Sequence, residues 1–276
     1  MREHEAGFRV RLMCRVLRVS PSGYYAWRGR APSKRAQARA ALDARVRSVF
    51  ASKKGREGAP RLSRALGCGR HPVAASLRRQ GLRAKGARKF KATTNSNHTL
   101  PVAENLLKQD FSAQRPNQVW VGDITYLGTD EGWLYLAVVL DLYSRKVVGW
   151  SMSERMTATL ACDALRMALF RRGMPRGVIM HTDRGSQYCS REHRDLLDQH
   201  GLIASMSAKG DCYDNAAMES WNGSLKVEAI HGERFATRDV VRTHVFDYIE
   251  VYYNRQRLHS TLGYLSPDGF ELSHAA

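Results

Sequence analysis

The sequence predicts an α/β protein in which a mixed β-sheet is flanked by helices and preceded by short all-α segments. Three apolar runs joined by short turns should pair as an antiparallel meander, and they span residues 119–127, 133–142 and 146–152. Beyond them, segments with helical and strand patterns alternate, at 157–172, 177–181, 191–200, 202–206 and 215–230. Three antiparallel strands followed by alternating helix and strand favour a mixed sheet covered by helices.

Positive charge is concentrated at the start of the chain. The net charge is +18, and residues 1–100 hold 25 Lys and Arg against 4 Asp and Glu, whereas residues 101–276 hold 19 against 22. Contacts with phosphates release counterions, so a basic region of this kind favours nucleic-acid binding over a merely solvated surface. We therefore expect the basic region to bind DNA.

Cysteine usage and hydropathy indicate a cytoplasmic protein. The five cysteines are widely spaced and form no Cys-x-x-Cys pair, which argues against disulfides and against a structural zinc site. No apolar run approaches the roughly 20 residues of a membrane span, and the charged N-terminus lacks a signal-peptide core. We expect no membrane contact.

Residues 1–82 should form a basic helical region with helix-turn-helix-like elements. Ser20 and Pro21 are typical of a helix start, although an ordinary helical hairpin fits this part equally well. A second helix pair flanks the turn at 67–70, and the helix opened by Pro72 should direct Arg78 and Arg79 outward. The remaining boundaries that we expect are a polar linker at 83–115, a core at 116–235 and a C-terminal helix and tail packed on or near the core at 236–276.

Three carboxylates are candidates for catalysis and metal binding. Asp123 lies within an apolar strand, where an unpaired charge is costly, so it needs a partner such as a metal ion. Asp183 follows the fourth strand, at the edge where open α/β sheets collect ligands. Glu219 lies on the helix after the fifth strand, with 35 residues between it and Asp183.

Helical geometry selects Glu219 among the nearby acids. At about 100° per residue, Glu219 shares a polar stripe with Asn215, Asn222 and Lys226, whereas Glu228 should point away. The opposite side of this helix should pack on the sheet through Met218, Trp221 and Leu225. A structural alternative for Glu219 is simple pairing with a surface Lys. The candidate DNA-binding residues are Lys226, Asn215, Asn222, Lys209, Arg78 and Arg79.

Four ordered motifs surround these carboxylates: WVGDITYL at 120–127, DLYSRKVVGW at 141–150, HTDRGSQY at 181–188 and DNAAMES at 214–220. Together with YNRQRLHSTLGY at 253–264 and SPSGYYAW at 20–27, they closely resemble OrfB-type transposases of the insertion-sequence-three family. That family is related to retroviral integrases and has an RNase H-like catalytic core. The resemblance spans most of the chain. It departs at Glu57, where the family has Tyr, and at Trp221, where Phe is usual.

The resemblance implies a DNA transposase that cleaves and joins insertion-sequence ends in DNA recombination and integration. Asp123, Asp183 and Glu219 would be the metal ligands, and Lys226 would contact the element's end. The implied partners are double-stranded DNA, further copies of the chain on that DNA, and an upstream-frame OrfA-type protein or a fusion with it. The implied location is the bacterial cytoplasm, at the nucleoid.

In-line displacement at a phosphodiester requires negative charge to be stabilised on the attacking and leaving oxygens. Two Mg²⁺ or Mn²⁺ ions about 3.5–4 Å apart can do this, and hard cations prefer carboxylate oxygens. We expect Asp123 to bridge both ions, with Asp183 and Glu219 each completing one. His181 is better explained as a structural imidazole than as a catalytic base.

Two alternatives remain open at the level of sequence. The chain could be an RNase H-like DNA nuclease without strand transfer, or an inactive DNA-binding accessory subunit. Near the C-terminus, Arg255 and Arg257 fit phosphate contacts and structural pairing equally well. An apolar stripe there predicts core packing or a subunit contact, and it comprises Val241, Val245, Tyr248, Ile249 and Tyr252.

Overall fold

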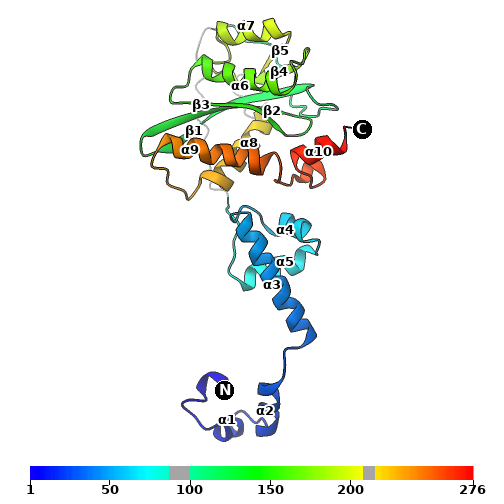
Figure 1. The fold of residues 1–276 in the computed structure, drawn as a ribbon, viewed down its shortest axis with the longest axis vertical. Coiled ribbons are helices and arrows are strands. Elements are labelled where there is room, and N and C mark those ends of the chain that lie inside the picture. The colour runs from blue at the N-terminus through cyan, green and yellow to red at the C-terminus, as the bar shows by residue number, and fades with distance from the viewer. Residues whose placement is uncertain (87–99, 208–214, 276) are drawn as a thin grey trace. The chain divides into compact units, whose positions relative to one another are not determined.

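The computed structural model describes residues 1–86, 100–207 and 215–275. The chain divides into two compact units, Met1–Arg83 and Ala84–Ala276 (Figure 1). In the described part of the chain, no helix is both long enough and apolar enough to cross a membrane.

The first unit consists of short helices. These are η1 (Arg2–His4), α1 (Val10–Val16), α2 (Pro21–Gly29), α3 (Lys34–Ser52), α4 (Ala59–Leu66) and α5 (Arg70–Arg79). Ser20 caps α2 as predicted, because its hydroxyl accepts a hydrogen bond from the Gly23 amide at 3.0 Å. A small core joins α3, α4 and α5, and its buried residues are Val46, Leu62, Leu66, Val73 and Leu77. We expected helix α5 to begin at Pro72, but it begins two residues earlier, at Arg70.

The second unit contains the predicted mixed sheet. Its strands are β1 (Val119–Thr129), β2 (Gly132–Asp141), β3 (Val147–Ser153), β4 (Ile179–Thr182) and β5 (Ile203–Met206). The spatial order is β3-β2-β1-β4-β5. The first three strands pair antiparallel, whereas β4 runs parallel to β1 and β5 parallel to β4. The predicted α/β fold class is therefore confirmed.

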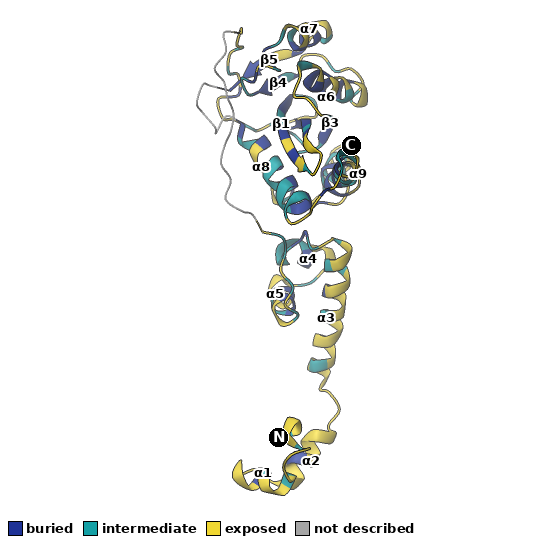
Figure 2. Ribbon diagram, turned by 90° about the vertical axis from the view of Figure 1, so that its left-hand side faces the viewer, coloured by how far each residue is buried: buried dark blue, intermediate teal, exposed yellow. Residues whose placement is uncertain are grey.

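Helices cover both faces of this sheet (Figure 1). On one face lie α6 (Ala158–Arg171) and α7 (Arg191–His200), which share a buried cluster with Trp120, Val139 and Met180. The other face is covered by α8 (Ala216–Leu225), the π-helical segment η3 (Lys226–Ile230), α9 (Arg238–Phe246) and the π-helical segment η4 (Asp247–Tyr253). The short η5 (Ser260–Leu262) and α10 (Pro267–Ser273) follow. Figure 2 shows the contrast between the buried sheet and the mostly exposed α1, α2 and α3.

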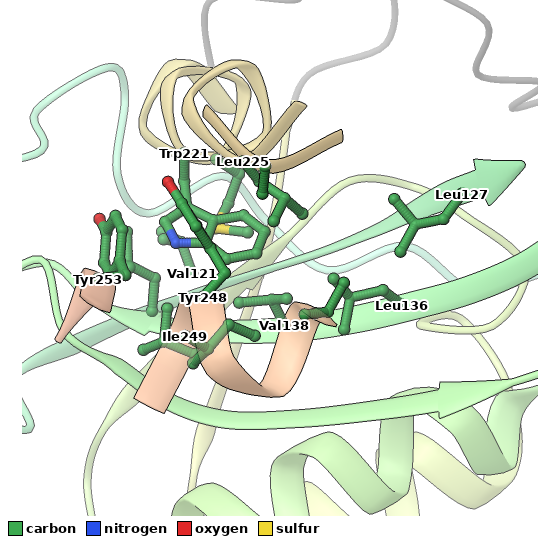
Figure 3. Close-up of a cluster of buried hydrophobic side chains, with 14 of the residues drawn as sticks. Val121, Leu127, Leu136, Val138, Trp221, Leu225, Tyr248, Ile249 and Tyr253 are labelled. Carbon is green, nitrogen blue, oxygen red and sulfur yellow. The ribbon is translucent and has the colours of Figure 1, made fainter. Parts of the chain in front are cut away.

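The core under α8 forms as the helical pattern predicts. Met218, Trp221 and Leu225 are at most 2% exposed and pack against a sheet face that includes Val121 and Val138 (Figure 3). The apolar stripe near the C-terminus belongs to the same core, since its residues Val241, Val245, Tyr248, Ile249 and Tyr252 are all buried there. The C-terminal segment is thus part of the body that positions α8.

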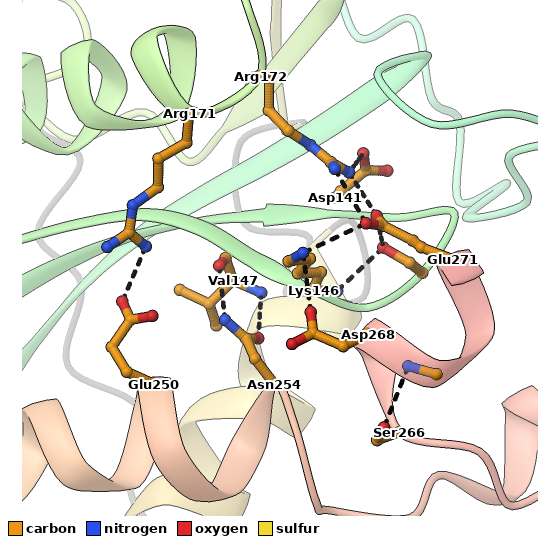
Figure 4. A network of polar contacts seen from close by, with 12 residues as sticks. Asp141, Lys146, Val147, Arg171, Arg172, Glu250, Asn254, Ser266, Asp268 and Glu271 are labelled. Carbon is orange, nitrogen blue, oxygen red and sulfur yellow. Dashed lines mark hydrogen bonds and ion pairs between the residues drawn. The ribbon is translucent and has the colours of Figure 1, made fainter. Parts of the chain in front are cut away.

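A polar network ties α10 to the edge of the sheet (Figure 4). Arg172 donates to Asp141 Oδ2 at 2.8 Å and to Glu271 Oε2 at 3.0 Å, and Asp141 is fully buried. Lys146 also pairs with Glu271, at 3.3 Å. Burial alone would raise the pKa of Glu271, but the bonds from Arg172 and Ser144 lower it below its ordinary value. The DLYSRK motif therefore anchors the end of the chain.

Strand β3 and helix α6 approach each other at Gly149. A Cβ atom at this position would lie 2.2 Å from the Ala164 carbonyl oxygen and 2.7 Å from the Ala168 amide nitrogen. Because these are backbone atoms, neither can move without shifting the helix away from the sheet. Only glycine permits the observed packing.

We predict that Gly149→Ala lowers the free energy of unfolding by about 2 kcal/mol or more, the upper range for overpacking a core. Gly223→Ala on α8 is the matched control, because a Cβ there meets no atom within 4 Å and alanine favours a helix. Urea unfolding of both variants checks this expectation. Equal stability of the two variants would contradict it.

Candidate active site

Parallel pairing of β1 with β4 brings two of the predicted catalytic residues together. The pairing ends at Gly122 and Thr182, so Asp123, which stays in β1, and Asp183, which directly follows β4, are neighbours. Burial and the neighbouring charge of Asp183 raise the pKa of Asp123 to about 7. The sequence placed Asp123 in the first strand and Asp183 after the fourth, and the structure shows that these two strands pair.

Short hydrogen bonds fix the orientation of both carboxylates. The Ile124 amide donates to Asp123 Oδ1 at 2.8 Å, and the Asn222 side-chain amide donates to Asp123 Oδ2 at 2.7 Å. The Gly185 amide donates to Asp183 Oδ1 at 2.9 Å. Each carboxylate oxygen can accept more than one bond, so these contacts orient the groups and leave lone pairs for a further ligand.

Tyr188 completes the wall of the site, a contribution that sequence reasoning missed. It is 3% exposed, and a Cβ added at Gly122 would lie 3.6 Å from its hydroxyl. Burial, together with the charges of Asp123 and Asp183, raises the pKa of Tyr188 well above its ordinary value. The phenol therefore stays protonated beside the carboxylates. The sequence signal that could have identified Tyr188 was its position at the end of the HTDRGSQY motif.

Glu219 lies on the exposed side of α8. The burial of Met218 and Trp221 beside it agrees with the predicted rotation of the helix. Within residues 1–86, 100–207 and 215–275, no three His, Cys, Asp or Glu side chains lie close enough to hold a metal ion. The convergence of Glu219 with the two aspartates stays a prediction.

Two candidate DNA contacts on the α8 stripe lie near Asp123. Asn222 orients Asp123, as described above. Lys226 is half-buried, and its ammonium lies 4.9 Å from the centroid of the Tyr126 ring. Burial lowers the pKa of Lys226, with Tyr126 and Asp123 opposing that effect. Both side chains therefore belong to the surroundings of the carboxylates.

The other candidate DNA contacts differ in exposure. Asn215 is 9% exposed, and its side-chain oxygen has no hydrogen-bond partner among the described residues. Arg78 is exposed, whereas Arg79 pairs with Asp43 at 2.6 Å within its own unit. Lys209 lies outside the described residues. DNA binding by these residues stays a prediction.

Two further residues have structural roles. His181 is fully buried, with Nδ1 2.9 Å from Ser205 Oγ and Nε2 3.3 Å from Ser207 Oγ, as expected for a structural imidazole. Arg257 is buried and binds Glu228 through Nε at 2.9 Å. Of its two open interpretations, structural pairing is the one realised. Arg255 is exposed.

The donor set of the Asp123 and Asp183 pair suits a hard divalent cation. Both groups offer carboxylate oxygens, which Mg²⁺ prefers. Burial and, second, the charge of Asp183 raise the pKa of Asp123, and a bound cation would offset both effects. The residues present therefore fit the expected metal.

Comparison with known proteins agrees with this architecture. Two family models, each described as an integrase core domain, match residues 113–212 and 219–273. A transposase InsF for insertion sequence IS3A of Escherichia coli (strain K12) is 58% identical over 99% of this chain and 98% of its own length. An uncharacterized 31 kDa protein of insertion element IS600 from Shigella sonnei is 48% identical over 94% of this chain and 97% of its own length.

Among solved structures, the chain is similar to one in the simian T-cell lymphotropic virus intasome complexed with the PP2A regulatory subunit B56 gamma. That similarity has a TM-score of 0.49 and 17% identity, over 79% of this chain and 75% of the other.

A five-stranded mixed sheet with two aspartates just beyond the parallel pairing of β1 and β4, matched by integrase-core models, defines a transposase with an integrase-type, RNase H-like core. More particularly, the chain belongs to the IS3 family of insertion-sequence transposases.

The raised pKa of Asp123 predicts an unusual pH dependence of the metal-free protein. A free Asp titrates near 3.9, so the folded state binds the proton more tightly and loses stability as the pH rises from about 4 through about 7. Asp123→Asn removes this penalty. At pH 8 we expect the free energy of unfolding of this variant to exceed that of the wild type by about 2 kcal/mol. The full pKa shift, at about 1.36 kcal/mol per pKa unit, would imply a larger difference, but the side chain is partly exposed, so solvent screens part of it.

Urea unfolding with a chelator at pH 4.5 and pH 8 measures this difference. Asp195→Asn is the control, since that side chain is 66% exposed. Adding Mg²⁺ at pH 8 should restore stability to the wild type but not to Asp123→Asn. A wild type that grows more stable between pH 5 and pH 8 without metal would refute the assignment.

Proposed function

We propose that this chain is a DNA strand transferase that cuts the ends of its insertion sequence and joins them to target DNA. The observation that carries the proposal is the pair of neighbouring carboxylates Asp123 and Asp183, each oriented by hydrogen bonds and each one residue beyond the parallel pairing of β1 with β4. The identity with IS3 transposases over nearly the full length supports it.

Asp123, Asp183 and Glu219 would hold two Mg²⁺ or Mn²⁺ ions. When bound, these ions stabilise the negative charge on the attacking and leaving oxygens. Asn222 keeps one Asp123 oxygen oriented, and the protonated Tyr188 closes the site from the interior. Lys226 supplies a positive charge beside Asp123 for a DNA phosphate.

No side-chain nucleophile is needed in this scheme. A water molecule attacks the phosphodiester at the element's end, and the bond to the leaving 3′-oxygen breaks to give a free 3′-hydroxyl. That hydroxyl then attacks a phosphodiester of the target strand, whose own 3′-oxygen leaves. Each step exchanges one P–O bond for another, so positioning and charge stabilisation suffice.

The basic N-terminal unit would bind the double-stranded DNA. Its helix pairs α1–α2 and α4–α5 have the form of helix-turn-helix elements, and Arg78 on α5 is exposed. Residues 83–115 would connect this unit to the core. We further propose that several copies of the chain assemble on DNA at the bacterial nucleoid, with an OrfA-type partner or as a fusion with it.

The test is a joining assay with labelled element ends, target DNA and Mg²⁺ or Mn²⁺, run on the chain alone and on its fusion with the upstream frame. Glu219→Gln should reduce joined product at least about 100-fold, the scale for losing a group that stabilises developing charge. Glu192→Gln, an exposed glutamate on α7, is the matched control and should retain activity.

Other outcomes would select the alternative functions. Cleavage without joining in the wild type would indicate a nuclease. DNA binding without products in the wild type, with no change in Glu219→Gln, would indicate an accessory subunit and exclude both enzymatic functions.

A further inference from the structure

Two large aromatic side chains touch each other on the surface at the tip of the β1–β2 hairpin. Tyr126 is 38% exposed and Trp133 is 53% exposed. Their ring centroids lie 5.0 Å apart with an interplanar angle of 82°, an edge-to-face contact. Exposed apolar surface of this kind is characteristic of binding sites.

The hairpin register explains this contact. Trp133 is the cross-strand partner of Gly128, and a Cβ at Gly128 would lie 3.4 Å from Trp133 Cζ3. The indole therefore leans over a residue without a side chain and meets Tyr126, two residues back on the same face of β1. The arrangement is built into the strands and does not depend on a mobile loop.

Positive charges lie on both sides of the aromatic pair. The Lys226 ammonium is 4.9 Å from the centroid of the Tyr126 ring, and Arg238 donates to the Trp133 carbonyl oxygen at 3.2 Å. Acidic groups nearby are already engaged: Glu131 accepts from the Arg238 amide, Glu154 pairs with Arg238, and Asp130 pairs with Arg234. The charge of Arg238 is thus matched by Glu154, and Lys226 is the cation that borders the Tyr126 ring.

This patch adjoins the catalytic carboxylates. Tyr126 is three residues beyond Asp123 on β1, about 10 Å along the strand, and because side chains alternate the two leave the strand on opposite faces. Lys226 links them, because its ammonium contacts the Tyr126 ring and it lies one helical turn beyond Asn222, whose side chain binds Asp123. A DNA strand whose phosphate lies at Asp123 would therefore bring its neighbouring nucleotides to the aromatic pair.

We propose that Tyr126 and Trp133 form a stacking subsite for an unpaired nucleobase next to the phosphate that is cut or joined. Rings interleaved with cations bind single-stranded nucleic acid, because every base offers a π-face and every linkage a phosphate. The faces of paired bases are covered by their neighbours in a duplex, so the occupant is an unpaired base. This proposal rests on the proposed function for its DNA substrate.

Two other roles for the Tyr126 and Trp133 pair, stabilisation of the hairpin and binding of a protein, explain the observed contacts less well than base stacking does. A cross-strand aromatic pair can stabilise a hairpin, but that role does not require more than half of Trp133 to stay exposed. An apolar protein partner would cover the rings, but Lys226 beside them would then lose hydration without gaining a phosphate.

The experiment measures binding without catalysis, in Ca²⁺, with the chain or with its upstream-frame fusion. The probes are element-end duplexes carrying 2-aminopurine beside the cleavage position, either fully paired or with that base mismatched. The wild type should quench 2-aminopurine in the mismatched duplex and bind it about tenfold more tightly than the paired one. Tyr126→Ala and Trp133→Ala should lose both effects.

Three variants serve as controls. Tyr126→Phe and Trp133→Phe keep an aromatic ring and should retain the quenching. Phe170→Ala removes a 78% exposed ring on α6 and should behave like the wild type. Thermal unfolding of each variant is measured in parallel.

The outcomes separate this proposal from the proposed function. Unchanged quenching and preference in the alanine variants would overturn the stacking subsite, as would a lowered unfolding temperature with the preference intact. Joining by a wild type that shows no preference for the unpaired base would overturn the subsite alone. A preference that depends on the two rings, without joining by the wild type, would support the subsite and contradict strand transfer.

Discussion

The burial of Asp123 beside the like charge of Asp183 is the constraint on which the catalytic site depends. Parallel pairing of β1 and β4 ends one residue before each aspartate, so two carboxylates meet at the end of a short, buried strand pair. This costs stability in the absence of a cation, and the raised pKa of Asp123 expresses that cost. The amides of Ile124, Gly185 and Asn222 offset part of it and fix the geometry.

The C-terminal segment holds α8 in the position that this geometry requires. Trp221 and Leu225 on α8 pack with Tyr248 and Tyr253 of η4 in one core (Figure 3). Beyond α8, the buried Glu228 binds Arg257 and accepts from Tyr248 at 3.0 Å. Removing one member of such a buried pair typically costs about 3–5 kcal/mol. The end of the chain is therefore structurally coupled to the helix that carries Asn222 and Glu219.

The hairpin beyond Asp123 has the opposite character. The sheet interior is filled with apolar side chains, but the tip of the β1–β2 hairpin leaves Tyr126 and Trp133 exposed beside Lys226 and Arg238. One strand thus passes from a dry core through a half-buried carboxylate to an exposed aromatic surface.

The sequence by itself determined the order of strands and helices, the buried side of α8 and the candidate acids, because these depend on periodicity and local pattern. Motif resemblance supplied the family. Only the tertiary structure decided that Arg257 pairs with Glu228, that Asn222 binds Asp123, and that Tyr188 lies beside both aspartates. These contacts join residues far apart in the chain, and their distances are set by how strands and helices pack, which no local pattern encodes.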